Sequence, residues 1–352
     1  MKKHKIGIIG AGMIAEKHLK SIKNTGRLKV KWLTDIVPDK LIKLKKEFGI
    51  PEVSDDYKHI LEDPEVKAVI ICTPPNLHRE MFIESIKAGK HVLLEKPAAM
   101  NMGELDEMIE IQNAYPEIIV CDCSARHSRL QPKYAVVKEI IESGALGEIY
   151  YIHHNSVGRN GRPGIEYNPD AKWFMNKAIA GGGPLFDWGV YDLSFHLGIL
   201  GDNHDLDYIT DVMLKSGLDN YDPGDWVYDV EEMFALNMRL TGGIKYFWER
   251  ANHANVEVPN ETRIYGTKGG LKFAYCSWDS PVIQVFDYNK KGKTRKKKIK
   301  LPMQNHSDDD AIISHFANLL DKKAQPEMPL QLARKHLDII WKCYEKAELI
   351  IS

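Results

Sequence analysis

Cysteine is scarce in this sequence, and no apolar run is long enough to cross a membrane. The 352 residues include five cysteines, an odd and scattered set that argues against a disulfide framework and for a reducing compartment. Cys121 and Cys123 are close together, but no second cluster accompanies them, so we expect strand packing and no metal site. A membrane helix needs about 18 apolar residues in a row, and no stretch of the sequence approaches that length.

A strong excess of charge of either sign is also missing. Lys and Arg number 48 against 49 Asp and Glu, a formal net charge of −1, so we expect neither a nucleic-acid nor a membrane partner. The chain starts with a basic and apolar stretch, MKKHKIGIIGAG, which glycines interrupt and charged residues soon follow. This pattern favours a first strand over a secretory signal, and we expect a cytoplasmic protein.

Short apolar runs alternate with amphipathic stretches of helical length between residues 5 and 122. The runs are continuously apolar, as in KAVIICTP and KHVLLEKP, which is typical of strands in a parallel sheet that is covered on both faces. Alternation of strands and helices at this spacing predicts an α/β Rossmann domain with a doubly wound parallel sheet over residues 1–125.

The pattern changes after residue 125. A helix within 131–144 leads to an alternating strand pattern in 147–158, and strands joined by tight glycine turns follow between 231 and 288. These features predict a second, α+β domain over residues 126–352 with an open, mostly antiparallel sheet. Its closing helix, residues 330–350, could pack back on the first domain. The basic stretch 290–300, with Asp308–Asp310 as its acidic counterweight, favours a solvated hairpin edge over a nucleic-acid patch.

A glycine turn between the first strand and the first helix is the first chemical motif, Gly10-Ala-Gly12-Met-Ile-Ala15. Gly10 allows a tight turn, Gly12 lets the backbone approach a pyrophosphate, and the start of the helix faces the phosphate charge. Asp35 follows the second strand, where a carboxylate accepts hydrogen bonds from the adenosine ribose and repels a 2′-phosphate, although it could instead cap the next helix. The motif predicts a dinucleotide site, with NAD favoured over NADP, that includes Gly10, Gly12, Met13, Ile14 and Asp35.

Two further strands end in turns that should face the same cofactor, TPPNLH (73–78) and EKP (95–97). Ligands of open α/β sheets bind outside the carboxyl ends of the strands. Asn76 could simply cap the following helix and His78 could simply begin it. Lys96 is costly at the end of a buried strand unless it has a partner or a task. We therefore add to the predicted cofactor site Thr73, Pro74, Asn76, His78, Glu95 and Lys96.

Residues 181–198, GGGPLFDWGVYDLSFHLG, form an apolar run with polar residues at regular positions. The proline after three glycines can open a helix, in which Asp187 and Tyr191 share one face and Asp192 and His196 share another. Buried carboxylates and phenols need partners, so Asp187 and Tyr191 are either a satisfied core pair or part of a site. For Asp192 and His196 we expect a structural role.

These motifs together resemble the Gfo/Idh/MocA superfamily of glucose–fructose oxidoreductase, inositol dehydrogenase and rhizopine-catabolism proteins. The resemblance covers essentially the whole chain, through the glycine turn with Asp35, TPPNLH, EKP, GGGPLFDWGVY, GTKGGL and the closing YEKAEL. It implies a Rossmann domain followed by an open-sheet domain that is often used for oligomer contacts, so we expect a homodimer or homotetramer. Members typically oxidise or reduce a sugar, cyclitol or related alcohol with NAD(P).

The resemblance also implies catalytic roles for three residues. Lys96 is the active-site lysine, and Asp187 with the residue four positions on completes the catalytic group. Many members have histidine there and aspartate three residues later, whereas this chain has Tyr191 and Ser194. It is therefore similar to the tyrosine-type branch, which argues against inositol as the substrate. A phenol ordinarily has a pKa of about 10, and a nearby ammonium lowers it and makes tyrosine a usable proton donor or acceptor. Asp187 would orient Lys96 or a substrate hydroxyl.

Polar residues outside these motifs are the candidates for substrate contacts: Arg126, His127, His153, Arg159, Asn160 and Trp173. Several lie in or beside the long loop 155–172, and loops of that length are usually functional or mobile. We expect an NAD(H)-dependent oxidoreductase that transfers hydride to or from a carbinol or carbonyl carbon of a sugar, polyol or related cyclic alcohol. Two alternatives stay open. One is an NAD-dependent glycoside hydrolase of the same superfamily, and the other is a non-catalytic NAD-binding regulatory protein, against which the retention of Lys96 and Tyr191 argues.

Overall fold

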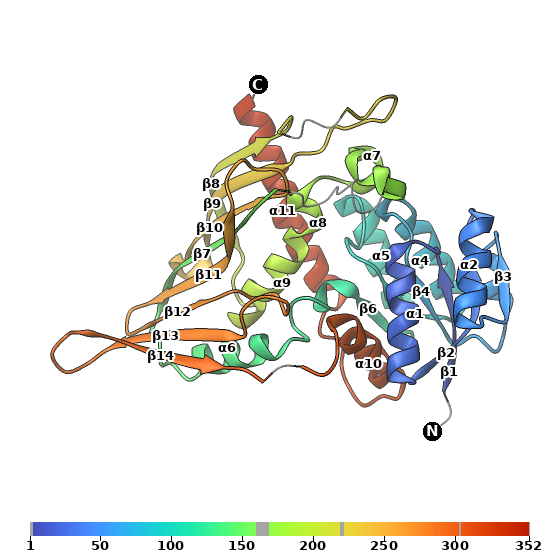
Figure 1. Ribbon diagram of the computed structural model, residues 1–352, viewed down its shortest axis with the longest axis horizontal. Coiled ribbons are helices and arrows are strands. Elements are labelled where there is room, and N and C mark those ends of the chain that lie inside the picture. Colours follow the sequence, from blue (N-terminus) through green and yellow to red (C-terminus); the bar gives the residue numbers. More distant parts are fainter. Residues whose placement is uncertain (1–2, 160–168, 219–221, 303, 352) are drawn as a thin grey trace. The chain divides into compact units, whose positions relative to one another are not determined.

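The computed structural model describes residues 3–159, 169–218, 222–302 and 304–351, and the chain divides into two compact units (Figure 1). The first unit comprises residues 1–126 and 305–334, and the second comprises residues 127–304 and 335–352. Residues 305–334 thus belong with the N-terminal unit, whereas the sequence pattern placed them in a domain over 126–352.

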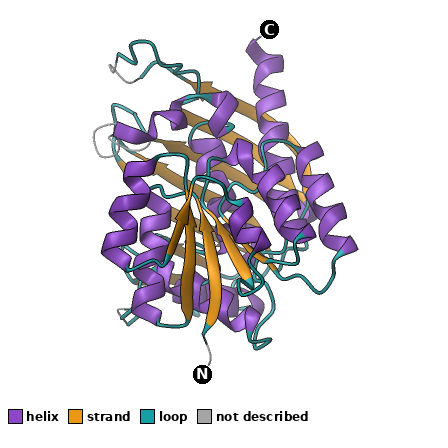
Figure 2. Ribbon diagram, turned by 90° about the vertical axis from the view of Figure 1, so that its right-hand side faces the viewer, coloured by secondary structure: helices purple, strands orange, loops and turns teal. Residues whose placement is uncertain are grey.

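A six-stranded parallel sheet forms the centre of the first unit, with helices on both sides (Figure 2). The strand order is β3-β2-β1-β4-β5-β6 and every pairing is parallel, so the predicted doubly wound Rossmann fold is confirmed. Every residue of β4 is 0% exposed, which is why this run is apolar throughout. The strands are β1 (His4–Ile9), β2 (Leu28–Thr34), β3 (Glu52–Ser54), β4 (Ala68–Ile71), β5 (His91–Leu94) and β6 (Val120–Asp122).

The helices of the first unit are α1 (Met13–Thr25), α2 (Pro38–Phe48), α3 (Lys58–Glu62), α4 (His78–Lys87), α5 (Met102–Ala114) and α10 (Asp308–Leu320), with 3-10 turns at Pro75–Leu77 and Cys123–Ala125. The short elements β3 and α3 were not predicted from the sequence, and neither was α10, which packs on α1. Ser307 and Asp310 form a capping box at the start of α10. The acidic triplet Asp308–Asp310 is therefore the first turn of a helix, where carboxylates are favourable, and not a counterweight to the basic stretch.

The second unit is built on an eight-stranded sheet in the order β14-β13-β12-β11-β7-β10-β9-β8. Only β7 and β10 pair in parallel among these described strands, and the other pairings are antiparallel, which confirms the expected open, mostly antiparallel sheet. The basic stretch forms the edge strand β14, and β8 was not predicted. The strands are β7 (Ile149–Val157), β8 (Leu206–Lys215), β9 (Met233–Leu240), β10 (Lys245–Ala251), β11 (Val258–Gly266), β12 (Gly270–Phe273), β13 (Val282–Tyr288) and β14 (Thr294–Lys300).

The helices of the second unit are α6 (Pro132–Glu142), α7 (Lys177–Ala180), α8 (Pro184–Asp187) and α9 (Gly189–Ile199), with 3-10 turns at Pro169–Met175 and Thr241–Gly243. Helix α11 (Leu330–Ile351) begins among residues of the first unit and ends among those of the second. None of the helices in the described ranges is both long enough and apolar enough to span a membrane.

The expectation of one continuous helix after the three glycines was wrong, because the helix is interrupted at Trp188. The amide of Trp188 donates to the carbonyl of Pro184 at 3.1 Å, and its own carbonyl accepts from the amides of Tyr191 at 2.9 Å and Asp192 at 3.1 Å. Trp188 is therefore the C-cap of α8 and the N-cap of α9. Asp187 is the last residue of α8, and Tyr191 lies in the first turn of α9.

Two of the three glycines before α8 are required by close neighbours. A Cβ on Gly182 would lie 2.1 Å from the hydroxyl of Tyr344, and one on Gly183 would lie 1.8 Å from the carbonyl oxygen of Glu231. The Glu231 carboxylate accepts from the amides of Gly183 at 2.9 Å and Leu185 at 3.0 Å, so it caps the start of α8. Burial raises the pKa of Glu231. These contacts fix the entry of the chain into α8.

A buried ion pair joins α9 to the sheet. Asp192 is 0% exposed and Arg250 of β10 is 5% exposed, and the guanidinium donates to the two carboxylate oxygens at 2.7 and 3.0 Å. Trp248 Nε1 donates to the same carboxylate at 2.9 Å, and the Tyr275 hydroxyl donates as well. Burial alone raises the pKa of a carboxyl, but Arg250 and His154 outweigh burial and hold the pKa of Asp192 well below its usual range. The carboxylate is therefore ionised within the core.

His196 lies one turn further along α9, in the same core. Its ring nitrogens are 2.7 Å from the hydroxyl of Tyr246 and 3.0 Å from the hydroxyl of Thr262. Burial lowers the pKa of His196 well below its usual value, so the imidazole is neutral. The resemblance gives no role to Asp192 and His196. Both side chains are thus hydrogen-bonded inside the second unit.

The buried pair predicts a stability change that depends on pH. Asp192→Asn leaves Arg250 without its counter-ion, and we expect a loss of about 3–5 kcal/mol in the free energy of unfolding near neutral pH. The wild-type pKa is depressed in the folded state, so this stabilisation is present above the unfolded pKa of about 3.9 and is lost as pH falls below it, by about 1.4 kcal/mol per pH unit. Urea unfolding at neutral and acidic pH measures the difference.

The matched control is Asp207→Asn, which removes an exposed carboxylate 3.7 Å from Arg239 and should cost less than about 1 kcal/mol. The difference in the free energy of unfolding between wild type and Asp192→Asn should shrink in acid. If it stayed constant down to about pH 3, Asp192 would not be an ionised carboxylate with a depressed pKa.

Candidate active site

The first candidate site lies at the edge of the parallel sheet where its strands end. Because the pairing is parallel throughout, the ends of β1, β2, β4 and β5 meet at one edge. The turns that follow these strands carry Gly10, Asp35, Thr73 and Lys96. Strands β1 and β4 are neighbours at the point where the direction of winding reverses, which is the position where ligands bind in sheets of this kind.

The glycine turn leaves room for a phosphate. Gly10 has a φ of 97°, and a Cβ there would lie 3.0 Å from the carbonyl oxygen of Cys72, so this turn passes close to the loop after β4. A Cβ on Gly12, the N-cap of α1, would meet no described atom within 4 Å. Met13 and Ile14 are half-buried in the first turn of α1. Open space at a helix N-terminus fits a pyrophosphate, so these residues fit a dinucleotide.

Asp35 links the glycine turn to the next helix. Its Oδ2 accepts from the amide of Ala11 at 2.6 Å, and its Oδ1 accepts from the amide of Val37 at 2.9 Å. Val37 is the N-cap residue of α2. The sequence left open whether Asp35 contacts the ribose of a cofactor or caps the next helix. The side chain has features of both, because it lies beside the glycine turn and also holds the start of α2.

His78 joins the two loops that are predicted to face the cofactor. It is 0% exposed, and its ring nitrogens lie 2.9 Å from the carbonyl oxygens of Pro97 and Thr73. Burial lowers the pKa of His78. Thr73 and Pro74 are half-buried and Asn76 is exposed. His78 therefore positions the loops, while contact of Thr73, Pro74 and Asn76 with the cofactor stays a prediction.

Glu95 is buried directly before Lys96 and is held by two basic residues. It is 4% exposed, and its Oε1 lies 2.7 Å from His18 Nε2 and 2.6 Å from Arg126 Nη1. Burial alone raises the pKa of this carboxyl, but Arg126 and His18 outweigh burial, so the pKa of Glu95 lies well below its usual range. Its Oε2 accepts from the amide of Lys96 at 3.2 Å. The carboxylate therefore fixes the backbone that carries the predicted catalytic lysine.

Arg126 was predicted to contact substrate, and the structure gives it a different environment. It is 3% exposed, and besides Glu95 it faces Asp309, with Nε 3.4 Å from the carboxylate oxygen. A guanidinium this deeply buried between two carboxylates favours a positioning role.

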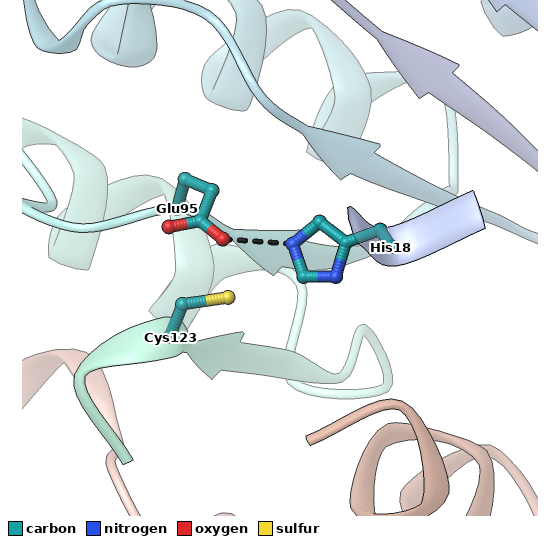
Figure 3. Close-up of side chains that lie close together, drawn as sticks. All are labelled: His18, Glu95 and Cys123. Atoms are coloured by element: carbon teal, nitrogen blue, oxygen red, sulfur yellow. Dashed lines mark hydrogen bonds and ion pairs between the residues drawn. The ribbon is translucent and has the colours of Figure 1, made fainter. Parts of the chain in front are cut away.

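The side chains of His18, Glu95 and Cys123 bring three possible metal-binding atoms within 4.8 Å of one another (Figure 3). All three residues are buried. The Arg126 guanidinium already compensates the charge of Glu95, and burial raises the pKa of Cys123 well above its usual value. A metal is bound by the thiolate and not by the neutral thiol. The contacts therefore favour a buried ion pair over a metal site at this place.

Tyr191 lies in a cluster of aromatic rings in the second unit. The ring centroid of Tyr191 is 4.9 Å from that of His127 and 5.4 Å from that of Trp188, and the centroid of Trp278 is 5.1 Å from His127 and 6.0 Å from Trp188. We call His127, Trp188, Tyr191 and Trp278 the four-ring cluster. Tyr191 is 1% exposed and Asp187, directly before Trp188, is 7% exposed. Lys96 belongs to the first unit, whereas Asp187 and Tyr191 belong to the second.

Ser194 stands at the position where, by the resemblance, many members have aspartate. Its side chain is hydrogen-bonded within the core. Its hydroxyl lies 2.8 Å from that of Ser128 and accepts from Arg129 Nε at 3.2 Å. Arg129 also forms two hydrogen bonds to Asp202, at 2.8 and 2.6 Å. These contacts give Ser194 a structural environment, in line with the tyrosine-type pattern.

His153 was predicted to contact substrate, and the structure places it on the other face of the sheet from α9, which carries Tyr191. His153 and His154 are neighbours on β7, and adjacent side chains of a strand point to opposite faces of the sheet. His154 Nε2 lies 3.4 Å from Asp192 of α9, so His153 points to the face opposite α9. There it contacts Arg263 at 3.0 Å, and burial and Arg263 together lower the pKa of His153 to about 4.

The other predicted substrate residues differ in their surroundings. Arg159 is exposed and donates to Asn255 Oδ1. Trp173 lies in a 3-10 turn and stacks on Phe174, with the ring centroids 3.8 Å apart. Asn160 lies outside the described residues. The structure thus places His127 beside Tyr191 and leaves the roles of Arg159 and Trp173 as predictions.

Three residues around this site were not predicted from the sequence. Trp188 stands between Asp187 and Tyr191 in the sequence, and in the continuous helix that we expected it is an ordinary core residue. Glu231 lies far from α8 in the sequence, and no local pattern marks it as the cap of that helix. Trp278 lies in the loop between β12 and β13, outside every motif, and only the fold brings it to His127.

Comparison with known proteins assigns the family. The NAD-binding Rossmann-fold model of the oxidoreductase family matches residues 4–121, and the GFO/IDH/MocA C-terminal domain model matches residues 134–272. The chain is 31% identical over 152 residues to myo-inositol 2-dehydrogenase of Thermotoga maritima, covering 43% of this chain and 45% of that protein. It is 30% identical over 200 residues to D-glucoside 3-dehydrogenase of Escherichia coli, covering 56% and 54%. The chain thus spans about half the length of these relatives.

Longer matches agree with this assignment. Levoglucosan dehydrogenase of Pseudarthrobacter phenanthrenivorans is 25% identical over 303 residues, covering 78% of this chain and 74% of that protein. A solved structure of levoglucosan dehydrogenase with NADH and levoglucosan has the same fold, with a TM-score of 0.84 over 99% of this chain and 98% of that chain at 21% identity. The two domain models and the shared fold place this chain in the Gfo/Idh/MocA family of oxidoreductases.

Proposed function

We propose that this protein is an NAD(H)-dependent oxidoreductase that transfers hydride to or from a carbinol or carbonyl carbon of a sugar, polyol or related cyclic alcohol. The observation that carries the proposal is the glycine turn with open space at the start of α1, in a chain that also holds a buried tyrosine within the four-ring cluster. Relatives named as inositol, glucoside and levoglucosan dehydrogenases support the substrate class.

The cofactor in this proposal is NAD(H). The residues that would hold it follow the strand ends of the first unit: Gly10, Gly12, Met13, Ile14, Asp35, Thr73, Pro74 and Asn76. Bound there, the cofactor accepts or supplies the hydride. His78 and Glu95 would act through the loops that they hold, and Lys96 would contact both cofactor and substrate.

Oxidation of an alcohol also releases the hydroxyl proton, and we assign that proton to Tyr191, which would accept it as the phenolate and become the neutral phenol. The ammonium of Lys96 would stabilise the negative charge that develops on the reacting oxygen, and the carboxylate of Asp187 would orient Lys96 or a neighbouring substrate hydroxyl. In the opposite direction Tyr191 returns the proton to the carbonyl oxygen.

We further propose that the protein acts in the cytoplasm as a homodimer or homotetramer. All five cysteines are buried thiols without a disulfide in the described structure, which supports a reducing compartment. Half-buried aromatic residues on the sheet face opposite α9, such as Tyr151 and Phe247, support an oligomer contact there.

Asp35 is expected to decide between NAD and NADP. Asp35→Asn keeps an acceptor for the amide of Ala11 but removes the charge that repels a 2′-phosphate, so we expect the ratio of kcat/KM for NAD to that for NADP to fall about tenfold or more. Asp35→Ser removes the acceptor geometry as well and should lower the same ratio. Initial rates with both cofactors measure it. The control Asp39→Ser changes an exposed carboxylate in the first turn of α2, and an unchanged ratio in the Asp35 variants would refute the assignment.

Lys96 and Tyr191 are expected to be required for turnover but not for cofactor binding. We expect Tyr191→Phe and Lys96→Ala each to lower kcat by roughly 10²–10⁴-fold, because proton transfer and charge stabilisation at the reacting oxygen are lost. NADH formation measures kcat, and titration calorimetry with NADH shows whether the cofactor still binds.

Tyr246→Phe and Lys90→Ala are the matched controls for Tyr191→Phe and Lys96→Ala. Tyr246→Phe removes a buried hydroxyl that contacts His196, and Lys90→Ala removes a buried ammonium at the other end of β5 that donates to the carbonyls of Asp63 and Val66. If the control variants lost as much kcat as Tyr191→Phe and Lys96→Ala, the losses would reflect the fold and the catalytic roles would be wrong.

A further inference from the structure

Trp278 combines large exposure with contact to the candidate site. Its side chain is 59% exposed, although it belongs to the four-ring cluster in which Tyr191 is 1% exposed. An exposed indole leaves a large apolar surface in water, and exposed apolar surface beside a polar site is typical of ligand contacts. The cluster therefore has a buried end at Tyr191 and an open end at Trp278.

The loop that carries Trp278 is anchored at its base. Lys133 is 4% exposed, and its ammonium donates to the carbonyl of Ala274 at 2.9 Å and also to the carbonyl of Cys276. The amide of Asp279 donates back to the carbonyl of Cys276 at 3.2 Å. These bonds hold the chain on both sides of Trp278, so the indole is presented from a fixed loop.

The second indole of the cluster, Trp188, packs against Arg250. The guanidinium of Arg250 lies 4.7 Å from the centroid of the Trp188 ring, and Arg250 is fixed by its two hydrogen bonds to Asp192. The imidazole of His127 contacts Tyr191 and both indoles, with centroid distances of 4.9, 6.2 and 5.1 Å. The cluster is therefore organised before any ligand binds.

A six-membered polyhydroxylated ring has the shape and chemistry that such a surface recognises. Its axial C–H bonds form an apolar face with partial positive charge, which complements the negative face of an indole. Its equatorial hydroxyls point outward from the rim, where polar side chains can reach them. An open-chain polyol has no such face, and binding would also freeze its many rotatable bonds.

We propose that Trp278 is the platform on which a six-membered polyhydroxylated ring lies by its C–H face, with one of its hydroxyls directed to Tyr191. Trp188, whose ring plane stands at 79° to that of Trp278, would be a side wall of this platform. The inference rests on the proposed function, because it names the substrate class of the same site. Pyranosides and cyclitols share the required face, whereas open-chain polyols do not. His127 lies between the platform and Tyr191 and would contact the rim of the ring.

The experiment is titration calorimetry on the NADH-loaded full-length protein, in which an alcohol binds without turnover. The ligands are methyl β-D-glucopyranoside as the pyranoside, scyllo-inositol as the cyclitol and D-sorbitol as the open-chain polyol. Wild type is compared with Trp278→Ala, with Trp278→Phe, which keeps an aromatic face, and with Tyr288→Ala, which removes another exposed ring, 57% exposed, on β13. Initial rates of NADH formation are measured on the same variants.

We expect wild type to bind at least one of the two ring ligands, and Trp278→Ala to raise its dissociation constant by roughly tenfold. Trp278→Phe should recover most of that loss, and Tyr288→Ala should change nothing. D-sorbitol should bind weakly and equally to all four proteins. Comparison of the dissociation constants of methyl β-D-glucopyranoside and scyllo-inositol shows whether the site prefers a pyranoside or a cyclitol.

The platform is overturned if neither ring ligand binds wild type, if Trp278→Ala binds rings as tightly as wild type does, or if D-sorbitol loses as much affinity as the rings. Oxidation that proceeds without dependence on Trp278 contradicts the platform and leaves the proposed function standing. Ring binding that depends on Trp278, without NADH formation from NAD, supports the platform and contradicts the proposed function.

Discussion

Each of the two main predicted catalytic residues is adjacent in sequence to a buried, ionised carboxylate. Asp192 follows Tyr191 and is paired with Arg250, and Glu95 precedes Lys96 and is paired with Arg126. A buried charge that loses its partner costs about 3–5 kcal/mol, so separation of either pair inside the core is strongly unfavourable. The backbones that carry Tyr191 and Lys96 are thereby fixed by interactions that do not themselves contact a substrate.

The two pairs also organise what lies beside them. Arg250 contacts the Trp188 ring, so the ion pair that holds α9 also holds an aromatic wall of the four-ring cluster. Glu95 accepts from the amide of Lys96, while His78 joins the following Pro97 to Thr73. A rigid support of this kind suits hydride transfer, because the reaction depends on the position of the reacting atoms and not on large changes in the protein.

The sequence predicted the first unit well and the second unit less well, for physical reasons. A parallel sheet covered on both faces produces apolar runs such as β4, and a glycine turn before α1 has a local pattern. In the second unit, β8 is exposed at most positions and has no clear alternation, and α10 is recognised only through its cap at Ser307. His153 and His154 are adjacent, so sequence alone could not tell which faces α9. Trp278 and Glu231 join the site through contacts between distant segments, which no local pattern records.

The central claim is that this chain oxidises a hydroxylated ring and leaves its glycosidic bond intact. The most direct test incubates wild type with NAD and p-nitrophenyl β-D-glucopyranoside and follows NADH and p-nitrophenol together. The account predicts net NADH formed in proportion to oxidised sugar, with no release of p-nitrophenol. Release of p-nitrophenol without net NADH would contradict it, because hydride would then return to the sugar within each turnover, as in the NAD-dependent glycoside hydrolase alternative.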